Sequence, residues 1–385
     1  MNKMSIFNII SLLGGLSLFL YGMRLMGDGL KKESSAALKK VMEKVTNNPF
    51  IGFVLGLLIT ALIQSSTATI VLTSGLVGAG IMTLHQSLGI IIGANVGTTV
   101  TGQIIRLLDI NAEASSWLNV FKPSTLAPLA AIAGIILILV LKSKKSNTFG
   151  TILLGFTILF TGLLSMTAAM DPLSTSESFQ RIFVSLADKP FLGFLMGMGV
   201  AFLLQSSSAT VGILQAIAMT GSLSFGAIYS MLIGIYIGDC VTTAIVCSIG
   251  SHADQKRVGI IHILFNLASI VLIFIGVTVL HRTHVLDEIW SRSITSGGIA
   301  NTHTLFKLAT AFLLLPVSGL FEKLSYKIVK DEKKEETRAS HQIETMEKVF
   351  FTSPALALDA VHKVISAMAE TSAKNVQRAI SLLNH

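Results

Sequence analysis

The chain has 385 residues, of which 51% are hydrophobic and only 13% are charged, and its formal net charge at pH 7 is +8. A soluble domain carries about 25% charged residues, so this composition excludes an ordinary soluble protein and indicates an all-α membrane protein with several spans. In such a protein, positive charge more often marks cytoplasmic loops than nucleic-acid binding, and we expect no nucleic-acid partner.

The first predicted element is an apolar helix over residues 6–26. It lacks a small-residue cleavage site and is followed by further apolar segments, so we expect a retained transmembrane helix rather than a signal peptide. Residues 27–47 combine lysines with apolar residues at helical spacing, which predicts a separate amphipathic helix on the inner leaflet. We group residues 1–47 as one N-terminal region.

Two short apolar segments, 50–63 and 70–82, flank the polar run QSSTAT at residues 64–69. At about 1.5 Å per residue each segment reaches roughly 20 Å, short of the roughly 30 Å hydrocarbon core. Each arm therefore reaches about the midplane and turns back. Non-helical backbone at that depth is stable only where protein or a water-filled site satisfies its polar groups. The pattern predicts a re-entrant helical hairpin whose polar tip lines a site.

Residues 146–187 predict a connecting transmembrane helix and an outer loop, which lead into a second copy of the same pattern. Residues 190–242 align with residues 49–101 without a gap, with 17 identities in 53 positions. Lysines at 31–44 and 142–145 place the start of the first copy inside, and the single crossing between the copies places the start of the second outside. We therefore expect two inverted repeats, 48–145 and 188–281, with tips that meet near the bilayer centre, as in transporters.

The chemistry of these tips favours an anion bound together with cations. Hydroxyl and amide groups donate and accept hydrogen bonds, and the helices that begin near Thr67 and Ser208 point the positive ends of their dipoles at the centre. Residues 50–105 and 191–255 contain neither Lys nor Arg. An anion there needs co-bound cations, for which we favour sodium over protons.

The paired motifs QSSTAT and QSSSAT, the segment Gly93–Thr101, HILFN at 262–266 and ANTHTLF at 300–306 resemble the type II sodium–phosphate cotransporters, in particular their bacterial branch. The resemblance covers residues 5–325 and implies that phosphate and sodium bind at the centre of the protein. For phosphate it implies Gln64, Ser65, Ser66, Gln205, Ser206, Ser207 and Ser208, and for sodium Thr67, Asn95, Thr98 and Thr99. To the sodium ligands we add Asp239, Thr242 and Thr243 of the second copy as our own expectation, because they lie at the positions equivalent to this motif or just after it.

The second copy departs from the family pattern where the first reads Gly-Ala-Asn-x-Gly-Thr-Thr. Tyr236, Asp239 and Cys240 replace Asn, Thr and Thr. A carboxylate at membrane depth is a functional candidate by default, so we expect Asp239 to be a cation ligand or a proton site; a hydrated place at a helix end is the alternative. These departures leave the ion stoichiometry open.

Several polar residues have simpler interpretations. Serine and threonine commonly form hydrogen bonds between helices in membranes. For Asn95, the alternative to a ligand role is to cap a break in the helix backbone. Cys240 and Cys247 are expected to be packing residues, and Arg106 and Asp109 are expected at the outer interface. We expect His262 and Asn266 to bond each other across one helix face. His303 and Lys307 are expected near a membrane boundary, in a packing or interface role.

The C-terminal part predicts a last transmembrane helix within 282–327 and a cytoplasmic region, 328–385. Residues 328–348 are polar and indicate a linker, and Pro354 opens an amphipathic helix that resembles the start of a PhoU-like regulatory bundle. The apolar stripe of that helix comprises Val361, Val364, Ile365, Met368, Val376, Ile380 and Leu383.

The function expected from the sequence is sodium-coupled symport of inorganic phosphate across the cytoplasmic membrane, with the C-terminal tail inside. Transport of another small anion, sulfate or a dicarboxylate, and a non-transporting phosphate sensor are the alternatives. We expect no enzyme and no cofactor, because a hydroxyl-rich centre without a general base is poorly suited to catalysis. The expected partners are phosphate, sodium ions and the lipid bilayer, and a homodimer is left open.

Overall fold

The computed structural model describes residues 6–42, 48–109, 120–141, 143–174, 181, 187–248 and 252–331, with scattered positions between 362 and 381. It divides into two units, Met1–Lys330 and Asp331–His385. The described residues form helices, and their only β-type pairing is an isolated bridge between Ser224 and Ser293. Five helices are long and apolar enough to cross a membrane, or six when one bent pair is counted as a span. The expected all-α membrane fold is confirmed.

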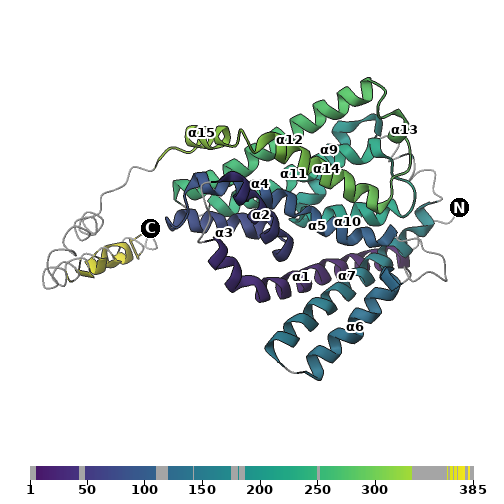
Figure 1. Ribbon diagram of the computed structural model, residues 1–385, viewed down its shortest axis with the longest axis horizontal. Helices are drawn as coiled ribbons and strands as arrows, with labels where there is room; N and C mark the ends of the chain where they lie inside the picture. Colours follow the sequence, from purple (N-terminus) through teal and green to yellow (C-terminus); the bar gives the residue numbers. More distant parts are fainter. Residues whose placement is uncertain are drawn as a thin grey trace. The chain divides into compact units, whose positions relative to one another are not determined.

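The first unit contains both long and short helices (Figure 1). The long apolar spans are carried by α1 (Ile6–Met42), α4 (Leu84–Gly97) continuing into α5 (Thr99–Ile105) and the 3₁₀ turn η1 (Arg106–Asp109), α7 (Lys144–Ser174), α11 (Phe225–Ser248) and α12 (Ala253–Arg282). The shorter helices are α2 (Pro49–Ile63), α3 (Ser66–Gly78), α6 (Pro123–Leu139), α9 (Pro190–Leu204), α10 (Ser207–Ala218), α13 (Asp287–Trp290), α14 (Ser296–Leu314) and α15 (Gly319–Ile328).

The duplication seen in the sequence is also present in the packing. Helices α2 and α3 form one hairpin and α9 and α10 form another, and α4 and α11 pack against their first arms. A Cβ added at Gly93 of α4 would lie 1.9 Å from the carbonyl oxygen of Phe53. At the equivalent Gly234 of α11 it would lie 2.0 Å from that of Phe194. Backbone-to-backbone approach through glycine, typical of membrane helices, therefore occurs at the same place in both repeats.

The two hairpins open at opposite ends of the bundle. At the end that carries α15, Gly78 at the end of α3 lies against Gln255 of α12. At the end that carries α13, the Ser293 hydroxyl donates to the carbonyl of Gly221, which follows α10, over 2.9 Å. Helix α12 joins these ends, since its 30 residues span about 45 Å, and His281 near its last turn stacks on Trp290 of α13.

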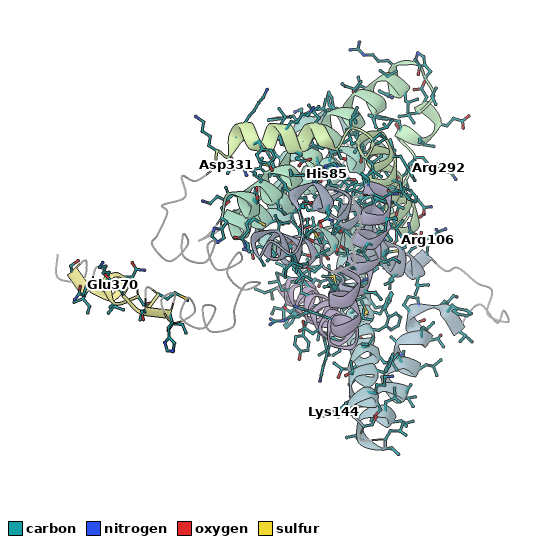
Figure 2. All side chains as sticks on the ribbon, turned by 60° about the vertical axis from the view of Figure 1, so that its left-hand side comes forward. His85, Arg106, Lys144, Arg292, Asp331 and Glu370 are labelled. Atoms are coloured by element: carbon teal, nitrogen blue, oxygen red, sulfur yellow. The ribbon has the colours of Figure 1, made fainter. Side chains whose placement is uncertain are left out.

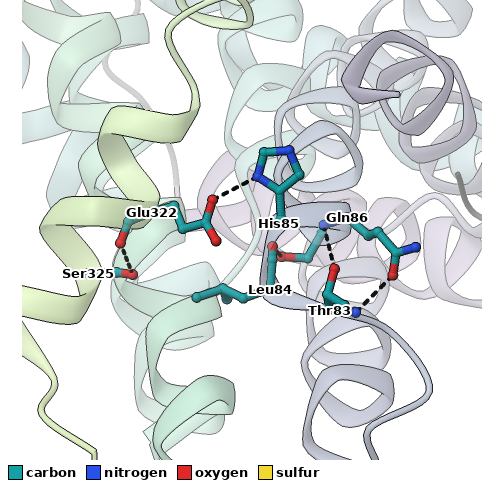
Figure 3. Close-up of polar contacts among 7 residues, drawn as sticks. Thr83, Leu84, His85, Gln86, Glu322 and Ser325 are labelled. Carbon is teal, nitrogen blue, oxygen red and sulfur yellow. Dashed lines mark hydrogen bonds and ion pairs between the residues drawn. The ribbon is translucent and has the colours of Figure 1, made fainter. Parts of the chain in front are cut away.

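Side-chain contacts show which elements lie together at each end of the bundle. His85 at the start of α4 binds Glu322 of α15 over 2.8 Å (Figure 3). At the other end, Arg106 and Arg292 lie on the same side of the unit (Figure 2), and Arg106 donates to Asn301 of α14. Two hairpins that enter the bundle from opposite ends can bring their tips together only in its middle, which is the arrangement expected for inverted repeats.

Helices α1, α6 and α7 form a group beside the two repeats. Glycines again permit the contact: a Cβ at Gly22 of α1 would lie 2.2 Å from the backbone nitrogen of Leu159 in α7. Helices α6 and α7 make an antiparallel pair with Lys144 at its far end (Figure 2). Phe19 of α1 is fully buried and approaches Gly212 of α10, so this group also contacts the second repeat.

Two elements differ from the sequence-based expectation. The transmembrane helix 6–26 and the separate amphipathic helix 27–47 are one continuous helix, α1, through Met42. The last crossing is not one straight helix, because α14 and α15 meet at 83°. Pro316 lies in the break and Gly319 begins α15, and proline cannot continue an α-helix without losing a backbone hydrogen bond.

The described positions of the second unit between 362 and 381 are helical, and Lys374 binds Glu370 over 2.8 Å. Four residues of the expected apolar stripe are exposed there: Ile365, Met368, Val376 and Ile380. The predictions for the linker beyond Asp331, for Pro354, and for Val361, Val364 and Leu383 lie outside the described residues.

Candidate functional site

Both hairpin tips are built with the same backbone geometry. Gln64 ends α2 and Gln205 ends α9 in the left-handed conformation, with φ of 58° and 51°. The next residue, Ser65 or Ser206, is extended and caps the second arm: its hydroxyl accepts a hydrogen bond from the backbone nitrogen three positions later, over 3.1 and 3.2 Å. Serine is a preferred N-cap residue because it satisfies a free backbone amide. The repeated motif thus produces a repeated helix break.

The tips share a cavity of about 420 Å³, here called the tip cavity. Its polar walls include Gln64 and Ser65 from the first tip and Gln205 and Ser206 from the second. The opposite wall is α1, which contributes Arg24, Asp28 and Lys31. The structure therefore brings four of the predicted phosphate ligands together, and adds two cationic side chains that the sequence did not assign to the site.

The α1 wall is charged and open. Arg24 and Asp28 lie 3.9 Å apart and their side chains are 81% and 70% exposed. Lys31 is also exposed. Exposed ion pairs of this kind contribute at most about 1 kcal/mol, so the Arg24 guanidinium can turn toward a bound anion at little cost.

A second polar cluster lies where the tips meet α11, around Asp239. The Ser66 hydroxyl of the first tip donates to the Asp239 carboxylate over 3.4 Å. Ser207 of the second tip also lies beside this carboxylate. Asp239 is only 8% exposed, so it is buried rather than hydrated at a helix end. Of the predicted phosphate ligands, Ser66 and Ser207 therefore face a carboxylate.

Neighbouring hydroxyls extend this cluster. The hydroxyl oxygens of Thr67 and Thr243 lie 3.3 Å apart and link α3 to α11. Ser208 is buried in α10, and Thr242 is half-buried on α11. Carboxylate and hydroxyl oxygens are hard ligands of the kind that alkali and alkaline-earth cations prefer.

The remaining predicted residues of the first repeat lie along α4 and α5. Thr98 and Thr99 donate to carbonyl groups of α4, those of Ala94 and Val96. Thr101 was not predicted as a ligand, but its hydroxyl donates to the Gln64 side-chain oxygen over 2.7 Å and so orients the first tip.

The Asn95 side chain binds a lysine. Lys307 of α14 donates to the side-chain oxygens of Asn95, over 2.9 Å, and Asn266, over 2.8 Å. Its ammonium also lies 3.6 Å from the ring centroid of Tyr236. Of the two roles expected for Lys307, an exposed interface role is excluded, because its side chain is buried in the bundle at 4% exposure, whereas a packing role is compatible with this burial. The available signal was a lone charged residue in a 19-residue apolar helix, which is functional by default in a membrane.

Other expectations about buried polar residues need smaller corrections. The Asn266 amide donates to the backbone carbonyl of His262 rather than to its ring, and that ring approaches the Cys240 sulfur at 3.8 Å. Both cysteines are free and buried, as expected for packing residues. Asp109 accepts from the backbone nitrogens of Ser296, over 3.1 Å, and Gly297, so it caps α14.

Comparison with known proteins agrees with this architecture. A model of the Na⁺/Pi-cotransporter family matches the chain twice, over residues 18–168 and 164–300, once for each repeat. The chain is 25% identical to the uncharacterized protein YqeW of Bacillus subtilis over 83% of this chain and 98% of that protein. No solved structure matches.

Two further relatives carry descriptive names. The chain is 25% identical to the putative inorganic phosphate export protein YjbB of Escherichia coli over 86% of this chain, and it spans 57% of the length of that protein. A shorter stretch of 66 residues, 17% of this chain and 10% of the relative, is 35% identical to the human sodium-dependent phosphate transport protein 2B. The family match covers most of the chain and both repeats: this multi-pass membrane protein belongs to the Na⁺/Pi-cotransporter family.

Proposed function

We propose that this protein carries inorganic phosphate across the cytoplasmic membrane together with sodium ions, by alternating access around the two hairpin tips. One observation supports this most: the same Gln-Ser pair from each repeat lines one cavity, while the next serine of each tip contacts Asp239. An anion pocket and a cation pocket then share the same two helix breaks.

Phosphate would bind on the cavity side. The N-termini of α3 and α10 carry partial positive charge and free backbone amides, which is why helix N-termini commonly bind phosphate. Gln64, Ser65, Gln205 and Ser206 supply further donors around the same cavity. Lys31 and Arg24 on α1 would attract the dianion and partly balance its charge.

Sodium would bind on the other side, between the tips and α11. Ser66, Ser207 and the Asp239 carboxylate converge there, with Thr67 and Thr243 beside them. Two anionic groups in a low-dielectric site repel each other strongly. A phosphate in the cavity and an ionised Asp239 therefore require a cation between them, which is the physical basis we propose for coupling.

Net export is a second candidate for direction. The tip cavity borders Lys31, near the lysine-rich end of α1 that the positive-inside rule assigns to the cytoplasm. A cavity reached from that side would load cytoplasmic phosphate, and the YjbB relative is named a putative export protein. We propose that the C-terminal tail lies on this same side.

The test is radiolabelled phosphate flux in proteoliposomes with sodium, potassium or no cation gradient. We expect accumulation driven by sodium alone, with unlabelled phosphate competing and sulfate and dicarboxylates failing to compete. Competition by sulfate or a dicarboxylate would indicate a transporter of another anion. Saturable phosphate binding without accumulation would indicate a sensor. Equal flux under all three cation conditions would overturn sodium coupling.

A further inference from the structure

The ammonium of Lys307 occupies a site made of cation-binding groups. Two amide oxygens, from Asn95 and Asn266, accept its hydrogen bonds over 2.9 and 2.8 Å, and the face of Tyr236 lies 3.6 Å away. Amide oxygens and an aromatic face are the groups that also bind a free cation. The lysine, Asn95, Asn266 and Tyr236 are all at most 4% exposed.

This site lies between equivalent positions of the two repeats. The offset that aligns the Gln-Ser-Ser motifs also aligns Asn95 of α4 with Tyr236 of α11. Lys307 comes from α14, outside both repeats, and contacts both residues at once. The lysine therefore fills a place formed by both repeats, next to the positions where the second repeat departs from the first.

The charge of Lys307 also complements the departure at Asp239. In the first repeat the equivalent residue is Thr98, which is neutral, and the second repeat adds a buried carboxylate. The Lys307 ammonium lies on the ring of Tyr236, and Tyr236 and Asp239 are three residues apart on α11, so the lysine is a near neighbour of that carboxylate. Isolated buried charges are costly unless they are paired, so a lysine from α14 and an aspartate from α11 offset one another.

The other titratable groups around the lysine carry no second fixed cation. They are Cys240 on α11, His262 on α12 and His303 on α14, together with the Tyr236 hydroxyl. Within the described residues, neither ring nitrogen of His303 has a hydrogen-bond partner, nor do His262 Nδ1 and the Tyr236 hydroxyl. Buried rings without partners are most stable when neutral, which leaves Lys307 as the positive charge of this cluster.

We propose that Lys307 is a tethered cation that takes the place of one co-transported ion, so that this protein moves one sodium fewer per phosphate than the same site would without the lysine. The proposal rests on the proposed sodium-coupled transport. Its physical content is substitution of a mobile ion by a fixed one: the site made by Asn95, Asn266 and Tyr236 keeps its cation whether or not sodium is present.

The test uses Lys307→Ala, which removes the ammonium and leaves space for an ion beside Asn95 and Asn266. Sodium and phosphate fluxes are measured together with two isotopes in proteoliposomes. We expect the sodium-to-phosphate ratio of the variant to exceed that of the wild type by one ion. Lys323→Ala is the matched control, because Lys323 is exposed on α15 and its loss should leave the ratio unchanged.

An equilibrium measurement separates this proposal from the proposed function. A ligand that binds only the folded protein raises its Tm. We expect sodium chloride, compared with N-methylglucamine chloride, to raise the Tm of Lys307→Ala by more than that of the wild type. Failure of wild-type sodium-driven uptake would overturn the proposed function alone, since this Tm comparison requires no transport.

A second variant covers the case in which Lys307→Ala does not fold. The double change Lys307→Ala with Asp239→Asn removes both charges, so it should fold and show no additional sodium stabilisation. An unchanged flux ratio and an unchanged sodium dependence of Tm in a folded Lys307→Ala would overturn the proposal. Failure of both variants to fold at any sodium concentration would do the same, because the lysine would then be required for packing rather than for charge.

Discussion

The two repeats share a backbone framework and differ in the chemistry of the helix that follows each hairpin. Helix α4 ends at Gly97 and continues as α5, whereas α11 runs unbroken from Phe225 to Ser248. Where α4 and its continuation carry Asn95 and Thr98, α11 carries Tyr236 and Asp239. The tips and glycine contacts have kept the geometry, while the second repeat has gained a buried negative charge. Duplication thus supplies the shape of the site, and divergence supplies its charge.

The largest effect is expected when the charge that distinguishes the second repeat is removed. Asp239→Asn removes an ionised acceptor shared by both tips, and hydrogen bonds to charged groups contribute ~1.5–3 kcal/mol. We expect the sodium concentration for half-maximal phosphate uptake to rise roughly tenfold to hundredfold. Thr98→Val at the equivalent position of the first repeat is the comparison and should change it much less. Equal effects at the two positions would mean that the repeats have not diverged in function.

A second test addresses what the repeats share. Gly93→Ala and Gly234→Ala each place a Cβ within 1.9–2.0 Å of a carbonyl oxygen. Such overpacking costs ~1–3 kcal/mol, and we expect a similar fall in Tm for both variants, measured by intrinsic fluorescence. Gly199→Ala is the control, because no atom lies within 4 Å of its added Cβ. A fall in only one of the two variants would show that the glycine frameworks are not equivalent.

The caps of the tips give a smaller and symmetric effect. Ser65→Ala and Ser206→Ala each remove an N-cap, at a cost of about 1 kcal/mol, and each removes a hydroxyl from the tip cavity. We expect each variant to lower Tm slightly and to raise the phosphate KM by a similar factor, while the sodium dependence stays near that of the wild type. A change of KM in only one variant would assign phosphate to a single tip.

The smallest effect on stability and uptake is expected from substitutions at a position where the two repeats differ but which lies away from the site. His85 pairs with Glu322 at the surface (Figure 3), whereas the equivalent residue of the second repeat is Gly226, which packs against Trp290. Exposed ion pairs contribute ~0.2–1 kcal/mol, so His85→Ala should lower Tm only slightly and leave uptake unchanged. Glu322→Gln should behave alike. A large loss of uptake in either variant would instead implicate α15 in transport.

Most of the site could be predicted from the sequence because its geometry is local and repeated. The short arms before and after Gln64, and their copy around Gln205, predict the helix breaks, and lysine positions predict the inversion. The sequence could not show that Ser65 lines the tip cavity while Ser66 contacts Asp239, since adjacent residues at the start of a helix point in different directions. That separation depends on how α11 crosses the tips.

Other features depend on contacts between distant elements. Lys307 lies in α14, outside the repeats, and only tertiary packing brings it to Asn95 and Asn266. Likewise, the continuity of α1 depends on packing along α7, which the local composition of residues 27–47 does not reveal.

The most direct test of the account asks whether both tips belong to one phosphate site. Ser65→Cys and Ser206→Cys, made singly, place a thiol on each side of the tip cavity, and the native cysteines are buried. The rate of modification by a charged thiol reagent is then measured with and without phosphate and sodium. The account predicts that phosphate with sodium slows modification at both positions, and that phosphate with potassium does so at neither. Protection at one position only, or protection independent of sodium, would contradict it.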